Sequence, residues 1–140
     1  MNWYNGFSPT QRTKALKWFR QQQKDGLKPH NPKVCDICSQ DEGIIDWHSE
    51  DYSEPFGSHI GEHGVCYICH MMIHCRFKSV QAWEVYTKAL KEKKCFTAFK
   101  NRNWIQFKQQ CLHDKFKNRE FKIVEKNGYD FISKLRIHNQ

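Results

Sequence analysis

Four of the seven cysteines stand in two Cys-x2-Cys pairs, and thiolates at this spacing can bind a metal ion. The pairs are Cys35 with Cys38 and Cys66 with Cys69. Zinc is held in closed tetrahedral structural sites by ligands delivered in such pairs. An odd cysteine count with two such pairs favours zinc over disulfides in a reducing compartment. The sequence therefore predicts a structural Zn²⁺ bound by these four side chains. The remaining cysteines are expected to be small buried apolar side chains: Cys75, Cys95 and Cys111.

Three histidines beside these pairs form a second candidate site. His70 and His74 are four residues apart, so both rings can meet one cation on one face of a helix. His48 ends the segment 44–48, which is rich in β-branched and aromatic residues and predicts a strand. A strand facing the helix would bring the three imidazoles together around a second divalent cation. In the alternative interpretation, His70 only packs beside the zinc and His74 lies on the surface.

The order of these residues resembles the zinc-stapled branch of the HNH endonucleases, the ββα-metal nucleases common in phage and bacteria. The resemblance covers residues 33–77. It rests on the first cysteine pair, then His48 followed by Asp51-Tyr52-x2-Pro55, then Cys-x2-Cys-His-x3-His. It implies a treble-clef-like module made of a zinc knuckle, a β-hairpin and a helix.

The resemblance also implies a role for each ligand. Cys35, Cys38, Cys66 and Cys69 match the positions that hold the structural zinc in the family. His70 and His74 match the helix positions that bind a catalytic cation such as Mg²⁺, Mn²⁺ or Zn²⁺. His48 matches the first member of the strand pair, and a histidine there activates the water that attacks the scissile phosphate.

Two departures from the family pattern bear on the base. Ser49 stands where a second histidine is common, and the asparagine expected before the second cysteine pair is missing from residues 58–65. His48 is the first choice for the general base, because a base on a rigid strand opposite a metal has the required geometry. His59 and His63 are alternatives, and a degenerate site is another. Acidic residues of this segment could support the cation or orient His48: Asp46, Glu50 and Asp51. For Asp51 and Tyr52 a structural role in the turn after the strand is favoured.

The net charge of +8 is unevenly distributed along the chain. Residues 1–30 hold six basic side chains and one acidic side chain. Residues 31–78 hold three basic and eight acidic side chains, and residues 79–140 hold fourteen basic and six acidic ones. Basic flanks interleaved with aromatics suit phosphates, while an acidic centre suits cations. We therefore expect nucleic acid, most readily DNA, as the partner, although a basic surface can also serve solubility alone. The residues expected to contact it are Arg12, Lys14, Lys17, Arg20, Lys24, Arg76 and Lys78.

The pattern of apolar residues predicts an α+β protein in which the ββα-metal module is embedded in a mainly helical domain. Ser8, Pro9 and Gln11 form a capping box that should start a helix ending near Gly26. Residues 53–64 are expected to be a loop, and helices are expected from Cys66, from Ser79 and over 101–113. The last of these should use Trp104, Phe107 and Cys111. For the tail, a hairpin turning at Asn127-Gly128 and a final helix capped by Asp130 are both open.

These expectations combine into one domain with three parts: a basic N-terminal helix and linker (1–32), the zinc-stapled module (33–78) and a basic helical extension (79–140). With no long apolar run and no signal-peptide core, we expect a soluble cytoplasmic protein of bacterial or phage type, without a membrane partner. The resemblance also implies a homodimer. The leading function is a metal-dependent DNA endonuclease. The alternatives are a non-catalytic zinc module that binds nucleic acid and a zinc-stapled protein-interaction domain.

Overall fold

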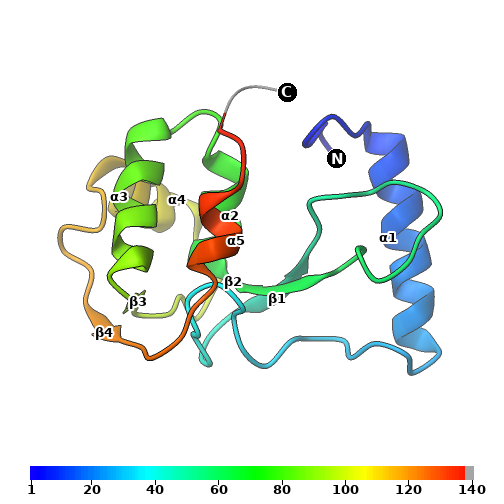
Figure 1. Cartoon of the computed structure of the whole chain (residues 1–140), viewed down its shortest axis with the longest axis horizontal. Coiled ribbons are helices and arrows are strands. Elements are labelled where there is room, and N and C mark those ends of the chain that lie inside the picture. Colours follow the sequence, from blue (N-terminus) through cyan, green and yellow to red (C-terminus); the bar gives the residue numbers. More distant parts are fainter. Residues whose placement is uncertain (138–140) are drawn as a thin grey trace.

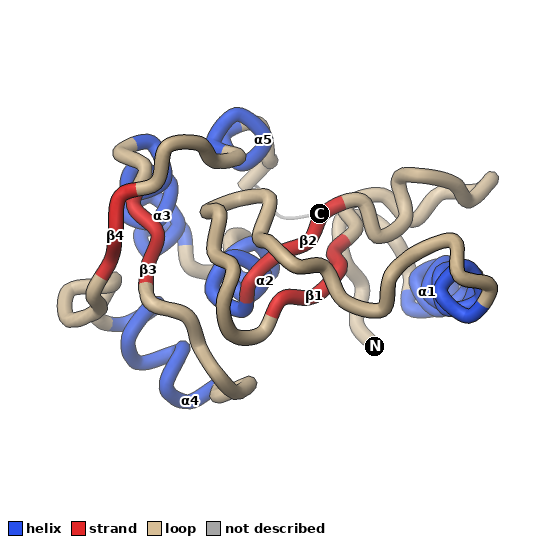
Figure 2. Tube along the Cα trace, turned by 90° about the horizontal axis from the view of Figure 1, so that it is seen from below, coloured by secondary structure: helices blue, strands red, loops and turns tan. Residues whose placement is uncertain are grey.

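The computed structural model describes residues 1–137 and has an α+β architecture (Figure 1). Two small antiparallel sheets of two strands each are surrounded by helices (Figure 2). Helix α1 lies at one end of the molecule, and α3, α4, β3 and β4 lie at the other, with β1, β2 and α2 between them. The elements are α1 (Pro9–Lys24), β1 (Ile45–His48), β2 (His63–Cys66), α2 (Tyr67–Cys75), α3 (Val80–Lys91), β3 (Lys94–Phe96), α4 (Trp104–Phe107), the π-helical η1 (Lys108–His113), β4 (Phe121–Ile123) and α5 (Tyr129–Ser133).

The capping box predicted for α1 is confirmed. Ser8 Oγ accepts a hydrogen bond from the amide of Gln11, and the Gln11 side chain accepts one from the amide of Ser8. The helix ends at Lys24, and Gly26 follows with φ +76°, a left-handed conformation that glycine adopts without strain. Ala15 and Phe19 are buried, which fixes the inner face of the helix.

Strands β1 and β2 form the hairpin that the sequence predicted between the cysteine pairs. Ile45 lies opposite Cys66, and His48 lies opposite His63. The strand β2 takes the last two residues of the segment that was expected to be loop. Helix α2 begins directly after β2, with Cys66 as its N-cap, and packs on both strands. The end of β1 and the first turns of α2 therefore face each other.

The C-terminal part differs from the sequence prediction in two places. The helix expected over 101–113 begins at Trp104 and widens into η1, and Trp104 is 45% exposed while Phe107 and Cys111 are buried. The tail forms no hairpin at Asn127-Gly128, because β4 pairs with β3 instead. Of the two open alternatives the helix is correct, although its N-cap is Gly128 and Asp130 lies in the first turn.

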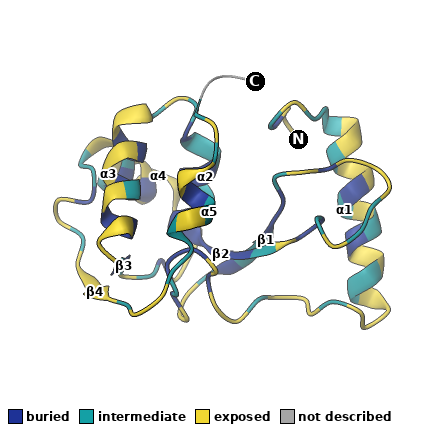
Figure 3. Ribbon diagram, in the orientation of Figure 1, coloured by how far each residue is buried: buried dark blue, intermediate teal, exposed yellow. Residues whose placement is uncertain are grey.

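One cluster of buried apolar side chains runs from Tyr4 near the N-terminus to Ile132 in α5. Figure 3 shows that β1, β2 and the inner faces of α1 and α3 are buried, while the outer faces of these two helices are exposed. Within residues 1–137, no helix combines the length and the apolar character that crossing a membrane requires.

Candidate metal centres

The four cysteines of the two pairs come together in one buried cluster. A ligand sulfur from each lies within 4.8 Å of the others. Cys38 Sγ and Cys66 Sγ are 3.6 Å apart. A Zn–S bond of about 2.3 Å places two sulfurs of a tetrahedral site about 3.8 Å apart, so this spacing fits zinc. In each pair the backbone amide of the second cysteine donates a hydrogen bond to the sulfur of the first. The distance is 3.5 Å both from Cys38 to Cys35 and from Cys69 to Cys66.

The cluster also favours a thiolate. Burial raises the pKa of the Cys35 thiol, but hydrogen bonds from the sulfurs of Cys38, Cys66 and Cys69 outweigh it, and the pKa lies well below its usual range. The thiolate is the form of cysteine that binds metals. In the same cluster the contact with Cys35 raises the pKa of Cys38 and burial raises that of Cys69, so Cys35 is the thiol that ionises first. The geometry of the four side chains suits a zinc site.

A fifth cysteine, Cys95, borders the cluster and was not assigned to it from the sequence. Its Sγ lies 3.9 Å from Cys38 Sγ and accepts a hydrogen bond from the Gln40 side chain at 3.7 Å. The Gln40 side chain also donates to the carbonyl oxygen of Phe96 at 2.9 Å, which ties the knuckle to β3. In the sequence, the spacing between the second cysteine pair and Cys95 does not match a zinc motif. The sequence therefore did not predict this contact.

The three histidines form the second cluster. One ring nitrogen of His48, His70 and His74 each lies within 4.8 Å of the others. The ring centroids are 5.2 Å apart for His48 with either partner and 4.9 Å apart for His70 with His74. The antiparallel pairing of β1 with β2 places His48 over the helix that follows, and the spacing of four residues places the other two on one face. The convergence expected from the sequence is present.

The electrostatic environment keeps the helix histidines neutral. Burial, followed by the charges of His48 and Arg102, lowers the pKa of His70 to about 3. Burial and the neighbouring His70 lower the pKa of His74 well below its usual range. Only a neutral imidazole has a lone pair for a metal. The two helix rings are thus in the form that binds a cation.

Behind His48 lies a buried polar network. His48 Nε2 is 2.5 Å from Glu50 Oε2, and the Arg76 guanidinium donates to Glu50 Oε1 at 2.8 Å. Tyr4 donates its hydroxyl hydrogen to Glu50 and accepts a hydrogen bond from Arg76 at 2.8 Å. Burial raises the pKa of Glu50, but the hydrogen bond with His48 and the charges of His48 and Arg76 outweigh it, so the pKa lies below its ordinary value. When His48 is neutral, the carboxylate accepts its Nε2 proton and the lone pair is on Nδ1.

Of the acidic residues weighed for supporting His48, Glu50 reaches it. Asp46 instead forms an ion pair with Arg102 at 2.6 Å. Asp51 accepts a hydrogen bond from the amide of Ser53 at 2.8 Å and fixes the turn, as its sequence context indicated. Tyr4 was missed, because nothing in the local sequence ties it to a strand more than forty residues away.

Ser49 and the two alternative bases, His59 and His63, make their contacts outside the histidine cluster. Ser49 is buried, and its hydroxyl accepts a hydrogen bond from the amide of Gly61 at 2.6 Å, which is a structural role. The Nε2 of His59 contacts the carbonyl oxygen of Ser53 at 2.8 Å. His63 packs against Phe131 and lies 3.5 Å from an oxygen of Asp36. These side chains are used in contacts outside the histidine cluster, although the backbone of His63 lies directly opposite that of His48.

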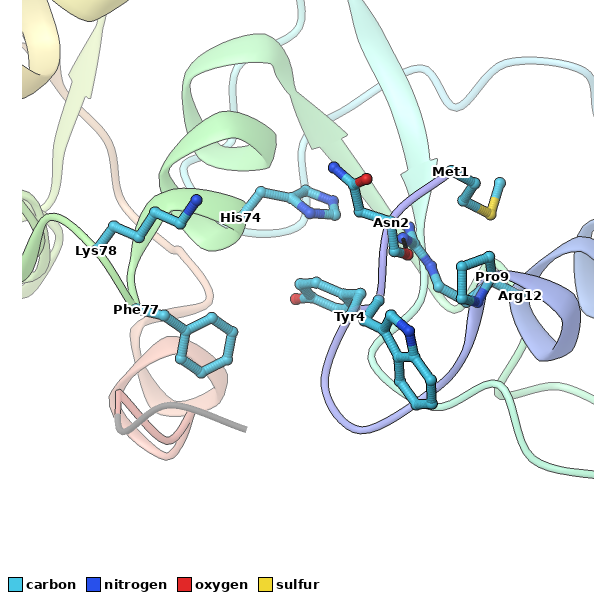
Figure 4. Close-up of a pocket in the computed structure, with 9 residues that line it drawn as sticks. Met1, Asn2, Tyr4, Pro9, Arg12, His74, Phe77 and Lys78 are labelled. Atoms are coloured by element: carbon cyan, nitrogen blue, oxygen red, sulfur yellow. Dashed lines mark hydrogen bonds between the residues drawn. The ribbon is translucent and has the colours of Figure 1, made fainter.

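The basic residues expected to contact nucleic acid occupy three kinds of position. Arg12 and Lys78 line a cavity of about 620 Å³ that His74 also lines (Figure 4). Arg76 is 1% exposed and neutralised by Glu50, so it supports the buried network and is out of reach of a phosphate. The others are exposed on α1: Lys14, Lys17, Arg20 and Lys24.

The molecule thus holds two adjoining clusters of different chemistry. The thiol cluster is closed, whereas the histidine cluster reaches a cavity through His74. Closed sites of four ligands are typical of structural zinc, and sites of three protein ligands beside a cavity are typical of catalytic metals. Comparison of the chain with protein-family models, with curated proteins and with solved structures gave no match.

Proposed function

We propose that the protein is a metal-dependent endonuclease of the HNH type, which hydrolyses phosphodiester bonds with a cation held by His48, His70 and His74. The observation that carries the proposal is the convergence of these three imidazoles, one of which, His74, lines a cavity together with Arg12 and Lys78. The order of knuckle, hairpin β1–β2 and helix α2 around the cysteine cluster supports a treble-clef-like ββα-metal module. The cysteines would hold a structural Zn²⁺ and stay outside the reaction.

The donor set favours one class of catalytic cation. Imidazole nitrogens suit Zn²⁺ and neighbouring transition metals, whereas Mg²⁺ prefers oxygen ligands. Among Mg²⁺, Mn²⁺ and Zn²⁺, three histidines with no carboxylate favour Zn²⁺ and then Mn²⁺. When bound, such a cation supplies activation of water and stabilisation of charge on the phosphate.

The protein's own side chains would divide the remaining work. Glu50 holds the Nε2 proton of His48, which favours His48 as a ligand through Nδ1 over its role as a free general base. Arg12 and Lys78 would neutralise phosphate oxygens from the cavity walls, because both are cations beside His74. Burial of His48 on the strand side excludes bulk water from one side of the site.

The test is cleavage of supercoiled plasmid DNA and of circular single-stranded DNA by the zinc-loaded protein with added Zn²⁺, Mn²⁺ or Mg²⁺. We expect nicking with Zn²⁺ or Mn²⁺, and loss of at least a hundredfold in the double variant His48→Ala/His74→Ala. The matched control is His113→Ala, since this histidine is exposed on η1. Cleavage that persists in a double variant still carrying one zinc per chain would contradict the proposal.

A second candidate is a nucleic-acid-binding module without catalysis. It is favoured by the structural role of Ser49 and by the contacts of His59 and His63 with Ser53 and Asp36, which engage both alternative bases outside the cluster. This candidate predicts salt-sensitive binding with no cleavage under any of the three cations. The same cleavage assay, with nucleic-acid binding measured in parallel, distinguishes the endonuclease from the non-catalytic module.

A further inference from the structure

The cavity that reaches His74, here called the N-terminal cavity, is cationic. Its walls include Arg12 from α1, Lys78 from the segment after α2 and His74, and none of the described residues that line it is acidic. Figure 4 shows Arg12 and Lys78 on opposite sides of the cavity, with His74 between them in this view. A ligand of this cavity must therefore carry negative charge.

Arg12 is held in place without a carboxylate partner. Its guanidinium carbon lies 5.2 Å from the ring centroid of Tyr4 and 5.1 Å from that of Tyr52, and Nη1 donates to the carbonyl oxygen of Asn2 at 2.6 Å. Within residues 1–137 its Nε is buried and has no hydrogen-bond partner. Its Nη2 lies 3.5 Å from the Tyr52 hydroxyl, and no carboxylate neutralises the guanidinium among the described residues. Arg12 therefore presents an uncompensated and well-positioned positive charge at the wall of the N-terminal cavity.

Half of the remaining lining residues are aromatic. Trp3, Tyr4 and Phe77 line the cavity, and Trp3 is 64% exposed. A large exposed indole next to fixed cations is the combination on which single-stranded nucleic acids bind, with phosphates on the cations and a base stacked on the ring. A base inside a duplex keeps both faces stacked on its neighbours, so the indole could not reach it.

We propose that the N-terminal cavity binds one unpaired nucleotide beside the scissile phosphate, with its phosphate on Arg12 and Lys78 and its base on Trp3, and that the substrate is therefore single-stranded nucleic acid. The inference rests on the proposed nuclease function and adds the class of substrate. The cavity volume of about 620 Å³ accommodates a nucleotide, which is in the size range of ligands held by such pockets.

The experiment measures fluorescence anisotropy of a labelled 20-nucleotide DNA strand and of a hairpin duplex of the same length, with the full chain loaded with zinc. We expect tighter binding of the single strand. Trp3→Ala should weaken single-strand binding about tenfold and leave duplex binding unchanged, since stacking of one base contributes ~1–3 kcal/mol. Arg12→Gln should weaken it similarly.

Matched controls remove the same side-chain types elsewhere. Trp104→Ala removes an exposed tryptophan of α4, and Lys88→Gln removes an exposed cation of α3, far from the cavity. Neither should alter the preference for single strands. Trp3 is largely exposed, so we expect Trp3→Ala to retain the fold. If Arg12→Gln lowers the melting temperature, the result for Trp3→Ala alone decides the test.

Three results would overturn the inference: equal affinity for both nucleic acids, no loss in Trp3→Ala, or an equal loss in Trp104→Ala. Its failure is distinct from that of the proposed function. A chain that cuts duplex and single strand at equal rates, unaffected by Trp3→Ala, would be a nuclease without this subsite. A chain that binds single strands through Trp3 but cuts nothing would keep the nucleotide site and lose the nuclease.

Discussion

The contact between His48 and Glu50 determines which nitrogen of the imidazole can face a cation. A carboxylate that accepts Nε2–H fixes the tautomer and orients the ring. Glu50 is in turn held by Arg76 and Tyr4, so the orientation of His48 depends on side chains from three separate parts of the chain. The Glu50–Arg76 pair is buried, and removing one buried partner leaves the other charge without compensation.

Replacing Glu50 therefore has two separable effects. Glu50→Gln should lower the metal affinity of the histidine site about 10–100-fold, because the tautomer is no longer fixed. It should also lower the free energy of unfolding by about 3–5 kcal/mol, because the Arg76 charge remains buried. Metal competition with a chromophoric chelator and urea unfolding measure the two effects.

The double variant Glu50→Gln/Arg76→Met is the control. Removing both charges should restore much of the stability but none of the metal affinity. If the double variant recovers both, Glu50 acts through stability alone and has no role in orienting His48.

The ligands themselves were predictable from the sequence, whereas their supports were not. His70 and His74 share a helix face, and Cys66 and Cys69 share a turn, so their spacing carries the information. Tyr4 and Arg76 meet Glu50 only after the chain has folded, and no local pattern records such a contact. The prediction that Arg76 contacts nucleic acid rested on its charge alone, and its burial gives that charge a different partner.

The histidine cluster should also make stability depend on pH. The folded-state pKa of His70 is about 3, below the value of about 6.5 in the unfolded chain, so between these values the unfolded state binds more protons. The contribution is fully present above pH 6.5 and is lost as the pH falls. Urea unfolding of metal-free protein from pH 6 to 5 should show a pH dependence of the unfolding free energy that is weaker in His70→Gln by up to about 1.4 kcal/mol per pH unit, and above pH 6.5 the two proteins should show the same pH dependence. An unchanged slope would show that His70 is solvated in the folded protein.

At the scale of elements, the hairpin and α2 have too little apolar surface of their own to hold the histidines rigidly. Strands β1 and β2 contribute few fully buried apolar side chains, and the cysteine cluster joins the knuckle to the start of α2. Metal binding to such a unit contributes directly to its folding. The histidine cluster consequently depends on the integrity of the cysteine cluster.

Cys66→Ser tests this dependence. We expect loss of one zinc per chain and of cooperative thermal unfolding, together with loss of metal binding by the histidines, because Cys66 belongs to the cysteine cluster proposed to hold zinc and is also the N-cap of α2. Metal content and far-ultraviolet circular dichroism are the measurements. Cys75→Ser removes a cysteine outside the cluster and should change neither. A folded Cys66→Ser protein without zinc would show that the metal is dispensable for this unit.

The elements that sequence patterns identified well are those formed by local signals, such as the capping box of α1 and the apolar stripe of α3. The tail was ambiguous because Asn127-Gly128 is a turn signal, but the partner of a strand is decided by tertiary pairing. Residues 121–123 pair with β3, at the far side of α4 and η1 in the sequence. Asn127 is instead used to cap α3, donating to the carbonyl oxygen of Leu90 at 2.6 Å.

For the molecule as a whole, the uneven charge has two consequences. Part of the acidic centre is neutralised internally, since Asp46 pairs with Arg102 of the basic C-terminal part. The cations of α1 face solvent with no such pairing among the described residues, and α1 also supplies Arg12 to the N-terminal cavity. Figure 1 shows α3, β3 and β4 at the end of the molecule opposite α1. A separate cavity at that end is lined by Lys88, Lys115 and Lys117, together with Glu92 and aromatic side chains.

If strands enter the N-terminal cavity, the cations of α1 should contribute more to binding than equal charge at the far end. The triple variant Lys14→Gln/Lys17→Gln/Lys24→Gln should reduce the slope of log K against log salt by about 2, because each phosphate contact to a single strand contributes about 0.7. The charge-matched variant Lys88→Gln/Lys115→Gln/Lys117→Gln removes the same three charges beyond the strand's path and should leave the slope nearly unchanged. Anisotropy titrations over a range of salt concentrations measure both. Equal reductions of the slope would mean that the nucleic acid responds to the total charge of the protein. A larger reduction in the second variant would mean that the nucleic acid binds at the end formed by α3, β3 and β4.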